Sequence, residues 1–310
     1  SGPRRLLRSP WVWAGAGIAL LMWLPWLAWQ AERSWPQLEV SSAIAEGGST
    51  TSEPRWAFLP FQLLLVSPFL APIWVAGLVR LFRDPELREL RCLAWAWVLL
   101  AAVFIVSSGK PYYLAGLFPV LLAAGAGQVE EWLGAGRRRR RTALLAGALS
   151  VSAVAGPVIA LPLLPLDKAG AVVAVNPDVG ETVGWPELAR TVAAVRARVP
   201  GGGRAVLLAR NYGEAGALDR YGPVLGLPPA YSGHNGYADL RVPPGDRSPV
   251  VAVGFARGGQ LERDFHRCVI RARIRSPHDI DNEENGAPVW VCAAPREPWS
   301  ELWPRLRRLG

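Results

Sequence analysis

The chain has 310 residues, of which 51% are hydrophobic and 19% are charged, and its formal net charge is +9 at pH 7. The positive charges gather at the ends of apolar runs instead of alternating with aromatic residues on a polar face, which argues against a nucleic acid partner. From Trp11 to about Leu166 charges are confined to short interruptions, whereas from Asp167 to Gly310 they are scattered as in a water-soluble domain. We therefore predict a transmembrane region over residues 1–166 and a soluble domain over residues 167–310.

Five apolar segments are long enough to cross about 30 Å of hydrocarbon. No Asp, Glu, Lys or Arg lies in their interiors, where each would cost about 2.5 to 3.5 kcal/mol on insertion scales. The predicted spans are residues 11–31, 58–81, 92–108, 111–129 and 142–166. Several contain prolines, and because neighbouring helices can satisfy the freed backbone groups, we expect kinked helices and no breaks. These prolines are Pro25, Pro68, Pro72, Pro119, Pro157 and Pro162.

Arginines alternate with the spans and indicate their orientation. The clusters within residues 4–8, 80–91 and 137–141 mark cytoplasmic segments. By alternation, the loop over 32–57, the turn over 108–111 and everything after Leu166 lie outside. We predict a multi-pass protein of the plasma (inner) membrane with a cytoplasmic N-terminus and an extracytoplasmic C-terminal domain.

After Leu166, short β-branched runs alternate with amphipathic stretches, a pattern typical of α/β layer folds. The expected strands are residues 205–210, 249–255, 269–274 and 288–293, and the expected helices are residues 185–199, 213–225, 260–267 and 299–309. This order predicts a small, mostly parallel sheet with helices on its faces. The glycine run over 201–203 follows a helix, not a strand, so it does not fit a dinucleotide-binding fingerprint. The fold class is therefore a polytopic helical membrane bundle of about five spans followed by a small extracytoplasmic α/β domain.

Lys110 is the most informative charge, because it lies on the outward side, where no orientation signal requires it. Its turn is so short that the side chain stays at the membrane surface, where it could meet a lipid phosphate. Tyr112 and Tyr113 follow and offer phenol hydroxyls. The alternative is a snorkelling lysine beside an interfacial aromatic belt.

This segment also carries a family resemblance. It reads Ser108-Gly109-Lys110-Pro111-Tyr112-Tyr113-Leu114, followed by Phe118-Pro119 and Leu121-Leu122-Ala123-Ala124-Gly125. It resembles the Lys-x-x-Tyr-Leu-x-x-x-Pro segment of polytopic GT-C glycosyltransferases, the dolichyl-phosphate-mannose protein mannosyltransferase-like and aminoarabinose-transferase-like proteins. Residues 62–68 and 72–78 are similar to the preceding helix of bacterial members, and residues 211–218 and 231–235 resemble the outer domain of the actinobacterial branch.

The resemblance implies a cell-envelope transferase that moves a sugar from a polyprenyl-phosphate donor to a glycan, lipid or protein acceptor at the outer membrane face. In such an inverting displacement a carboxylate acts as base and cations hold the departing phosphate. Lys110, with Tyr112 or Tyr113, maps onto the donor-phosphate region.

The family's catalytic aspartate lies in a first outer loop near the N-terminus, and nothing before Trp11 matches that loop. The chain, which begins at Ser1, thus looks like the C-terminal portion of a longer enzyme, and its catalytic residue stays unknown. The alternative is a non-enzymatic membrane protein whose outer domain binds glycan or protein.

Five polar residues of the soluble domain fall in loops or at strand ends, where an α/β sheet presents its ligand crevice. They are Asn211, Tyr212, Glu214, His234 and Asn235. They could bind the acceptor or a sugar. Equally, the asparagines could serve turns and Glu214 could cap a helix.

The sequence requires no cofactor. An acidic loop could hold a divalent cation, although it lacks the regular Asp-x-Asp-x-Asp-Gly frame of a calcium loop and fits a solvated loop better. Its residues are His278, Asp279, Asp281, Glu283 and Glu284. Three histidines without a Cys-x-x-Cys pair argue against zinc, so no metal site is assigned.

The three cysteines divide by compartment. Cys92 lies at a cytoplasmic helix end and should stay reduced, whereas Cys268 and Cys292 share the oxidising side. We predict a Cys268–Cys292 disulfide, with two buried strand thiols as the alternative.

Overall fold

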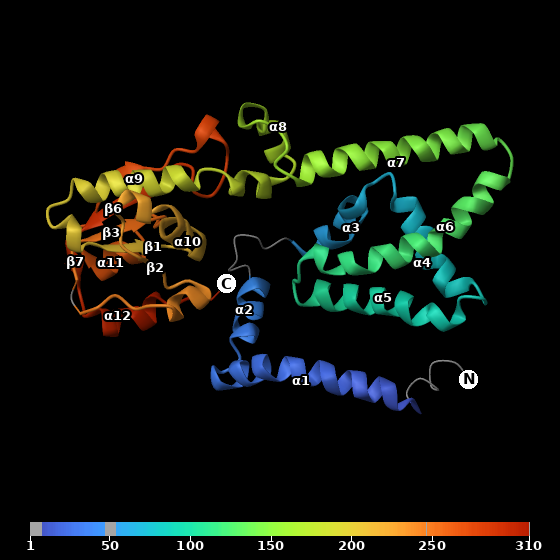
Figure 1. Cartoon of the computed structure of the whole chain (residues 1–310), viewed down its shortest axis with the longest axis horizontal. Helices are drawn as coiled ribbons and strands as arrows, with labels where there is room; N and C mark the ends of the chain where they lie inside the picture. The colour runs from blue at the N-terminus through green and yellow to red at the C-terminus, as the bar shows by residue number, and fades with distance from the viewer. Residues whose placement is uncertain (1–7, 47–53, 246, 310) are drawn as a thin grey trace. The chain divides into compact units, whose positions relative to one another are not determined.

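The computed structural model describes residues 8–46, 54–245 and 247–309 (Figure 1). The chain divides into two compact units with the boundary between Gly156 and Pro157. The first unit is helical, and the second contains the sheet. The boundary precedes the one expected at Leu166, because the last residues of the fifth apolar run pack with the second unit.

Seven α-helices are described in or beginning in the first unit. They are α1 (Pro10–Glu32), α2 (Pro36–Ala45), α3 (Phe58–Val66), α4 (Ala71–Arg83), α5 (Arg91–Val106), α6 (Phe118–Gly134) and α7 (Arg138–Ala160), with the 3-10 segments η2 (Arg55–Ala57), η3 (Arg88–Leu90) and η4 (Pro111–Leu117). Within the described ranges, four helical segments are long and apolar enough to cross a membrane, or five if a bent pair counts as one span. The four are Pro10–Glu32, Arg88–Val106, Pro111–Gly134 and Arg138–Ala160.

The second expected span is broken, not kinked, which corrects the prediction for residues 58–81. The segments Arg55–Val66 and Ala71–Arg83 meet at 109°. Pro68 has no N–H to donate and disfavours a helical conformation at Ser67, so the helix stops there. The Ser67 hydroxyl accepts the Phe69 N–H at 3.3 Å and is 2.7 Å from the Ser152 hydroxyl of α7, which together supply polar partners at the break.

The core of the first unit lies between α4, α5, η4 and α6. Trp74 of α4 contacts two aromatic rings there, with its centroid 5.8 Å from that of Trp97 and 5.4 Å from that of Phe118. The Gln62 side chain of α3 donates to the Phe58 carbonyl at 3.2 Å and to the Pro111 carbonyl at 2.9 Å. The turn that carries Lys110 is thereby tied to α3.

The second unit contains a five-stranded sheet in the order β2-β1-β3-β6-β5. Its strands are β1 (Val206–Ala209), β2 (Ala230–Tyr231), β3 (Val250–Val253), β5 (Val269–Arg273) and β6 (Pro288–Cys292), and a separate pair is formed by β4 (Phe265–His266) and β7 (Ala294–Pro295). β1 is parallel to β2 and β3, whereas β6 is antiparallel to β3 and β5. The sheet is therefore mixed, not mostly parallel as expected, because β5 and β6 follow each other without a crossover helix.

Helices cover both faces of this sheet (Figure 1). The sheet is covered by α9 (Trp185–Ala197), α10 (Tyr212–Tyr221), α11 (Gln260–Asp264) and α12 (Trp299–Leu306), whereas α8 (Gly170–Val173) packs in a separate apolar cluster. α9 and α10 pack on the face that includes Leu207, and α11 and α12 pack on the face that includes Leu208. Because successive strand residues point to opposite faces, both must be apolar, which explains the uninterrupted hydrophobic runs of β1 and β3.

Cys268 and Cys292 are joined by a disulfide, with their Cα atoms 4.1 Å apart. It links the residue before β5 to the end of β6 and so closes the antiparallel edge of the sheet. Cys92 is a free, exposed cysteine.

Candidate functional site

The carboxyl ends of the parallel strands β1 and β3 form the edge where ligands bind in open α/β sheets. Asn211 begins α10 just after β1, and Gly254 follows β3. Asn211 Oδ1 accepts the Glu214 N–H at 2.7 Å, while Glu214 Oε2 accepts the N–H groups of Arg210 at 2.8 Å and Asn211 at 3.1 Å. This reciprocal capping box gives Asn211 and Glu214 a structural role at the beginning of α10.

The Glu214 carboxyl group is enclosed at this edge, with 3% of the residue exposed. Gly254 makes room for it, since a Cβ at that position would lie 1.9 Å from Glu214 Oε1, and its φ of +82° also favours glycine. Burial raises the pKa of Glu214 to about 8, and the charge of Glu284 adds to the rise. At neutral pH this side chain is therefore mostly a neutral carboxylic acid.

Glu284 lies near Glu214, and Glu181 lies near Glu284. Glu284 is 6% exposed, and burial together with the charge of Glu181 raises its pKa to about 7. Burial also raises the pKa of Glu181, and a hydrogen bond with Glu284 opposes this rise. A polar interaction with the side chain of Asn211 opposes the rise in the pKa of Glu284. Glu214 and Glu284 are both buried, and their raised pKa values allow each to retain a proton near neutral pH.

An aromatic pair and the end of the chain complete the site. The rings of Tyr212 and His234 are 4.9 Å apart at 37°, with His234 buried and Tyr212 53% exposed. Arg308 pairs with the backbone on either side of His234, because its N–H donates to the Gly233 carbonyl and its carbonyl accepts the Asn235 N–H, both at 2.8 Å. Burial and the charge of Arg210 lower the pKa of Arg308.

The structure thus brings together Asn211, Tyr212 and Glu214 on one element and places His234 against Tyr212. Asn235 contributes its backbone. The sequence missed Glu284, Glu181 and Arg308 as neighbours of this site, because each comes from a loop distant in sequence. The exposed ring of Tyr212 offers a flat face on which a sugar ring could stack.

The turn before η4 is the second candidate site. Lys110 is buried, whereas Tyr112 and Tyr113 are exposed. The Nε of Arg55 donates to the Ser108 hydroxyl at 3.1 Å. Arg55 therefore lies at the same turn as Lys110, which provides two cations and a hydroxyl group near one end of α5.

The acidic loop does not gather its side chains. Asp279 Oδ1 accepts the Asn285 side-chain N–H at 3.0 Å, and the Glu283 N–H donates to Glu181 at 3.0 Å. Asp279, Asp281 and Glu283 are exposed, whereas Glu284 is buried. In the part of the chain that the structure describes, no group of three or more His, Cys, Asp or Glu residues is placed to hold a metal ion.

No protein-family model, curated protein or solved structure matches this chain.

Proposed function

We propose that this chain is the C-terminal portion of a multi-pass membrane glycosyltransferase that uses a polyprenyl-phosphate sugar donor at the extracytoplasmic face of the plasma membrane. The observation that carries the proposal is the joint presence of Arg55, Lys110 and the Ser108 hydroxyl at one turn. A phosphate monoester or diester needs such a combination of cations and donors. The exposed phenols of Tyr112 and Tyr113 add two hydroxyl donors next to it.

The proposed topology follows from the arginine clusters at the ends of the apolar helices. It places the N-terminus in the cytoplasm, and the Ser108–Pro111 turn and the α/β domain outside. Donor phosphate and α/β domain then share one side of the membrane.

In the proposed reaction, an acceptor hydroxyl oxygen bonds to the anomeric carbon, the bond from that carbon to the phosphate oxygen breaks, and the phosphate leaves with the electron pair. Lys110 and Arg55 would stabilise the charge on the departing phosphate. The acceptor proton passes to a carboxylate base, which is not assigned to this chain. The exposed residues at the sheet edge around Tyr212 would hold the acceptor or the sugar.

The test is binding of undecaprenyl phosphate by the full-length protein in nanodiscs, with undecaprenol as the matched ligand that lacks the phosphate. Arg55→Ala and Lys110→Met should each weaken binding of the phosphate at least tenfold, because one charge-assisted hydrogen bond is worth about 1.5 to 3 kcal/mol. Arg88→Ala, which removes a cation from the opposite set of loops, should leave the affinity unchanged. Equal binding of phosphate and alcohol by every variant would contradict the proposal.

A non-enzymatic glycan-binding protein is the second candidate. The exposed ring of Tyr212, which contacts the ring of His234, favours it, since a sugar could stack on this ring without any donor lipid. Glycan binding that survives Arg55→Ala and Lys110→Met, without any phosphate-dependent lipid binding, would support this candidate over the transferase.

A further inference from the structure

The chain stays apolar after α7 ends at Ala160, over the sequence Leu161-Pro162-Leu163-Leu164-Pro165-Leu166. The sequence assigned these residues to the fifth span, but Pro162 and Pro165 cannot continue a helix, so the segment leaves the helix axis. All four leucines are exposed, and Leu163 is exposed by 58%. Val175, just after α8, is exposed as well.

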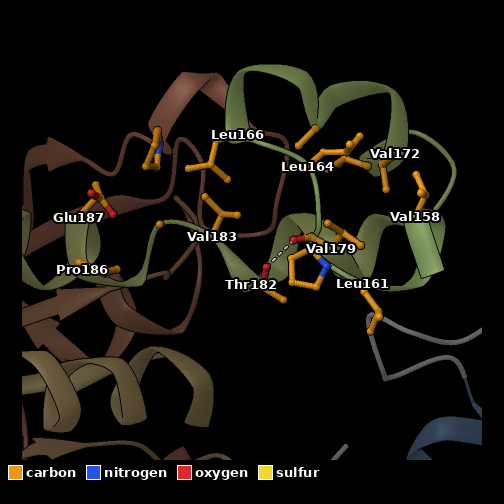
Figure 2. A pocket seen from close by; sticks show the side chains of 15 residues that line it. Val158, Leu161, Leu164, Leu166, Val172, Val179, Thr182, Val183, Pro186 and Glu187 are labelled. Carbon is orange, nitrogen blue, oxygen red and sulfur yellow. Dashed lines mark hydrogen bonds between the residues drawn. The ribbon is translucent and has the colours of Figure 1, made fainter.

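The segment covers an apolar cavity of about 530 Å³ in the second unit (Figure 2). Leu161, Leu164 and Leu166 line it together with Val179 and Val183 of the following turn. Its only acidic or basic lining residue within the described ranges is Glu187. An open apolar cavity rimmed by exposed leucines is a costly surface in water.

A small buried cluster fixes the segment to the domain. Ala169, Val172 and Val173 pack there against Val179 and Ile280. The Asn176 side chain also donates to the Ile159 carbonyl at 2.9 Å, which ties the end of α8 back to the end of α7. The leucines are thus displayed on a folded support.

We propose that residues 161–175 are a lipid-facing surface of the outer domain, with the leucines and Val175 in the outer leaflet and the cavity open to its acyl chains. The apolar surface of residues 161–166 is continuous in sequence with the apolar helix α7, which favours a bilayer as its partner. No charged residue occurs from Thr142 to Leu166, so the apolar surface prolongs α7 without interruption, and Asp167 and Lys168 follow at the level expected for lipid headgroups. The inference rests on one part of the proposed function, the crossing of the membrane by α7, and not on glycosyl transfer.

The test uses single cysteines carrying an environment-sensitive fluorophore in the full chain with Cys92→Ala, reconstituted in phosphatidylcholine nanodiscs. The probe position is Leu163→Cys, with Leu166→Cys as a second position if the first variant fails to fold. Val224→Cys is the matched control, because Val224 is an apolar residue of the same unit exposed by 89%. Leu149→Cys in α7 reports whether that helix lies in the membrane.

Lipids brominated near the glycerol should quench the probe at residue 163 at least threefold more than the probe at residue 224, and lipids brominated deeper in the chain should quench the probe at residue 149. Quenching at 149 without extra quenching at 163 overturns the lipid-facing surface and leaves the membrane span intact. Lack of quenching at both positions overturns both. A probe at 163 that is shielded from water but not quenched by lipid indicates a protein partner and also overturns the proposal.

Discussion

Gly77 of α4 lies directly against the backbone of Leu121 in α6, since a Cβ added to Gly77 would be 1.8 Å from the Leu121 carbonyl oxygen. The contact is reciprocal one turn away, where a Cβ on Gly125 would be 2.1 Å from the Ile73 carbonyl oxygen. Small residues that let two helix backbones approach are a recurrent device of membrane helix packing. The close packing of α4 against α6 therefore requires glycine, which has no Cβ, at both positions.

Replacing Gly77 by alanine should destabilise the bundle by at least about 1 kcal/mol, because the backbone that blocks the new methyl group must shift. Thermal unfolding in detergent measures this effect. Gly147→Ala in α7 is the matched control, because nothing lies within 4 Å of its added Cβ. Equal melting temperatures for Gly77→Ala and Gly147→Ala would contradict the close approach.

The raised pKa values of Glu214 and Glu284 predict that the free energy of unfolding depends on pH. The folded-state pKa of Glu214 is about 8, whereas the ordinary pKa of a glutamate is 4.5, so between these pH values the folded state retains a proton that the unfolded state has lost. The contribution of Glu214 is therefore fully present below about pH 4.5 and declines as the pH rises to about 8, with each pKa unit worth about 1.4 kcal/mol. Glu284, with a pKa of about 7, acts in the same direction.

Glu214→Gln should flatten this dependence, because glutamine keeps a carbonyl acceptor for the N–H groups of Arg210 and Asn211 but does not ionise. Unfolding measured at intervals from pH 5 to pH 9 tests the expectation. Glu301→Gln, at an exposed position of α12, provides the control and should retain the slope of the wild type. A variant at residue 214 with an unchanged slope would show that Glu214 does not titrate in this range.

The exposed ring of Tyr212 predicts a role in sugar binding. Tyr212→Ala should reduce the affinity for a panel of neutral oligosaccharides by about tenfold, because stacked aromatic contacts contribute about 0.5 to 1.5 kcal/mol beyond the area they bury. Tyr212→Phe keeps the ring and should retain most of the affinity in isothermal titration. If both variants bind as the wild type does, the ligand does not stack on Tyr212.

The Cys268–Cys292 disulfide should stabilise the second unit by about 2 to 4 kcal/mol. Mass spectrometry under non-reducing conditions, after alkylation, should find one free thiol per chain, at Cys92. Three alkylated cysteines would contradict the bond. A Cys268→Ser variant should unfold at lower temperature, and dithiothreitol should not lower its melting temperature further.

Apolar length and the period of the hydrophobic pattern account for what the sequence could predict. They located the apolar helices and the four longer strands, since these elements bury whole faces. The break at Ser67 was not predictable in the same way, because a proline inside a span is compatible with either a kink or a break. The choice depends on whether a partner such as Ser152 is near in space.

Some residues of the candidate sites could be predicted from local sequence patterns, and others could not. Asn211 and Glu214 were identifiable from local spacing, because a capping box joins two residues that are three positions apart. Lys110 was identified by its unusual place in a short turn. Glu284 and Arg308 lie near this site but come from segments distant in sequence. No local sequence pattern predicts that they come together. The mixed sheet was missed for a related reason, since strand direction depends on how β5 and β6 connect.

The pairing of Arg308 with the backbone around His234 has a practical consequence for handling this protein. Two hydrogen bonds at 2.8 Å join Arg308 to Gly233 and Asn235, so a segment distant in sequence fixes the backbone that presents His234 to Tyr212. A truncated variant intended for ligand-binding measurements should therefore retain Arg308.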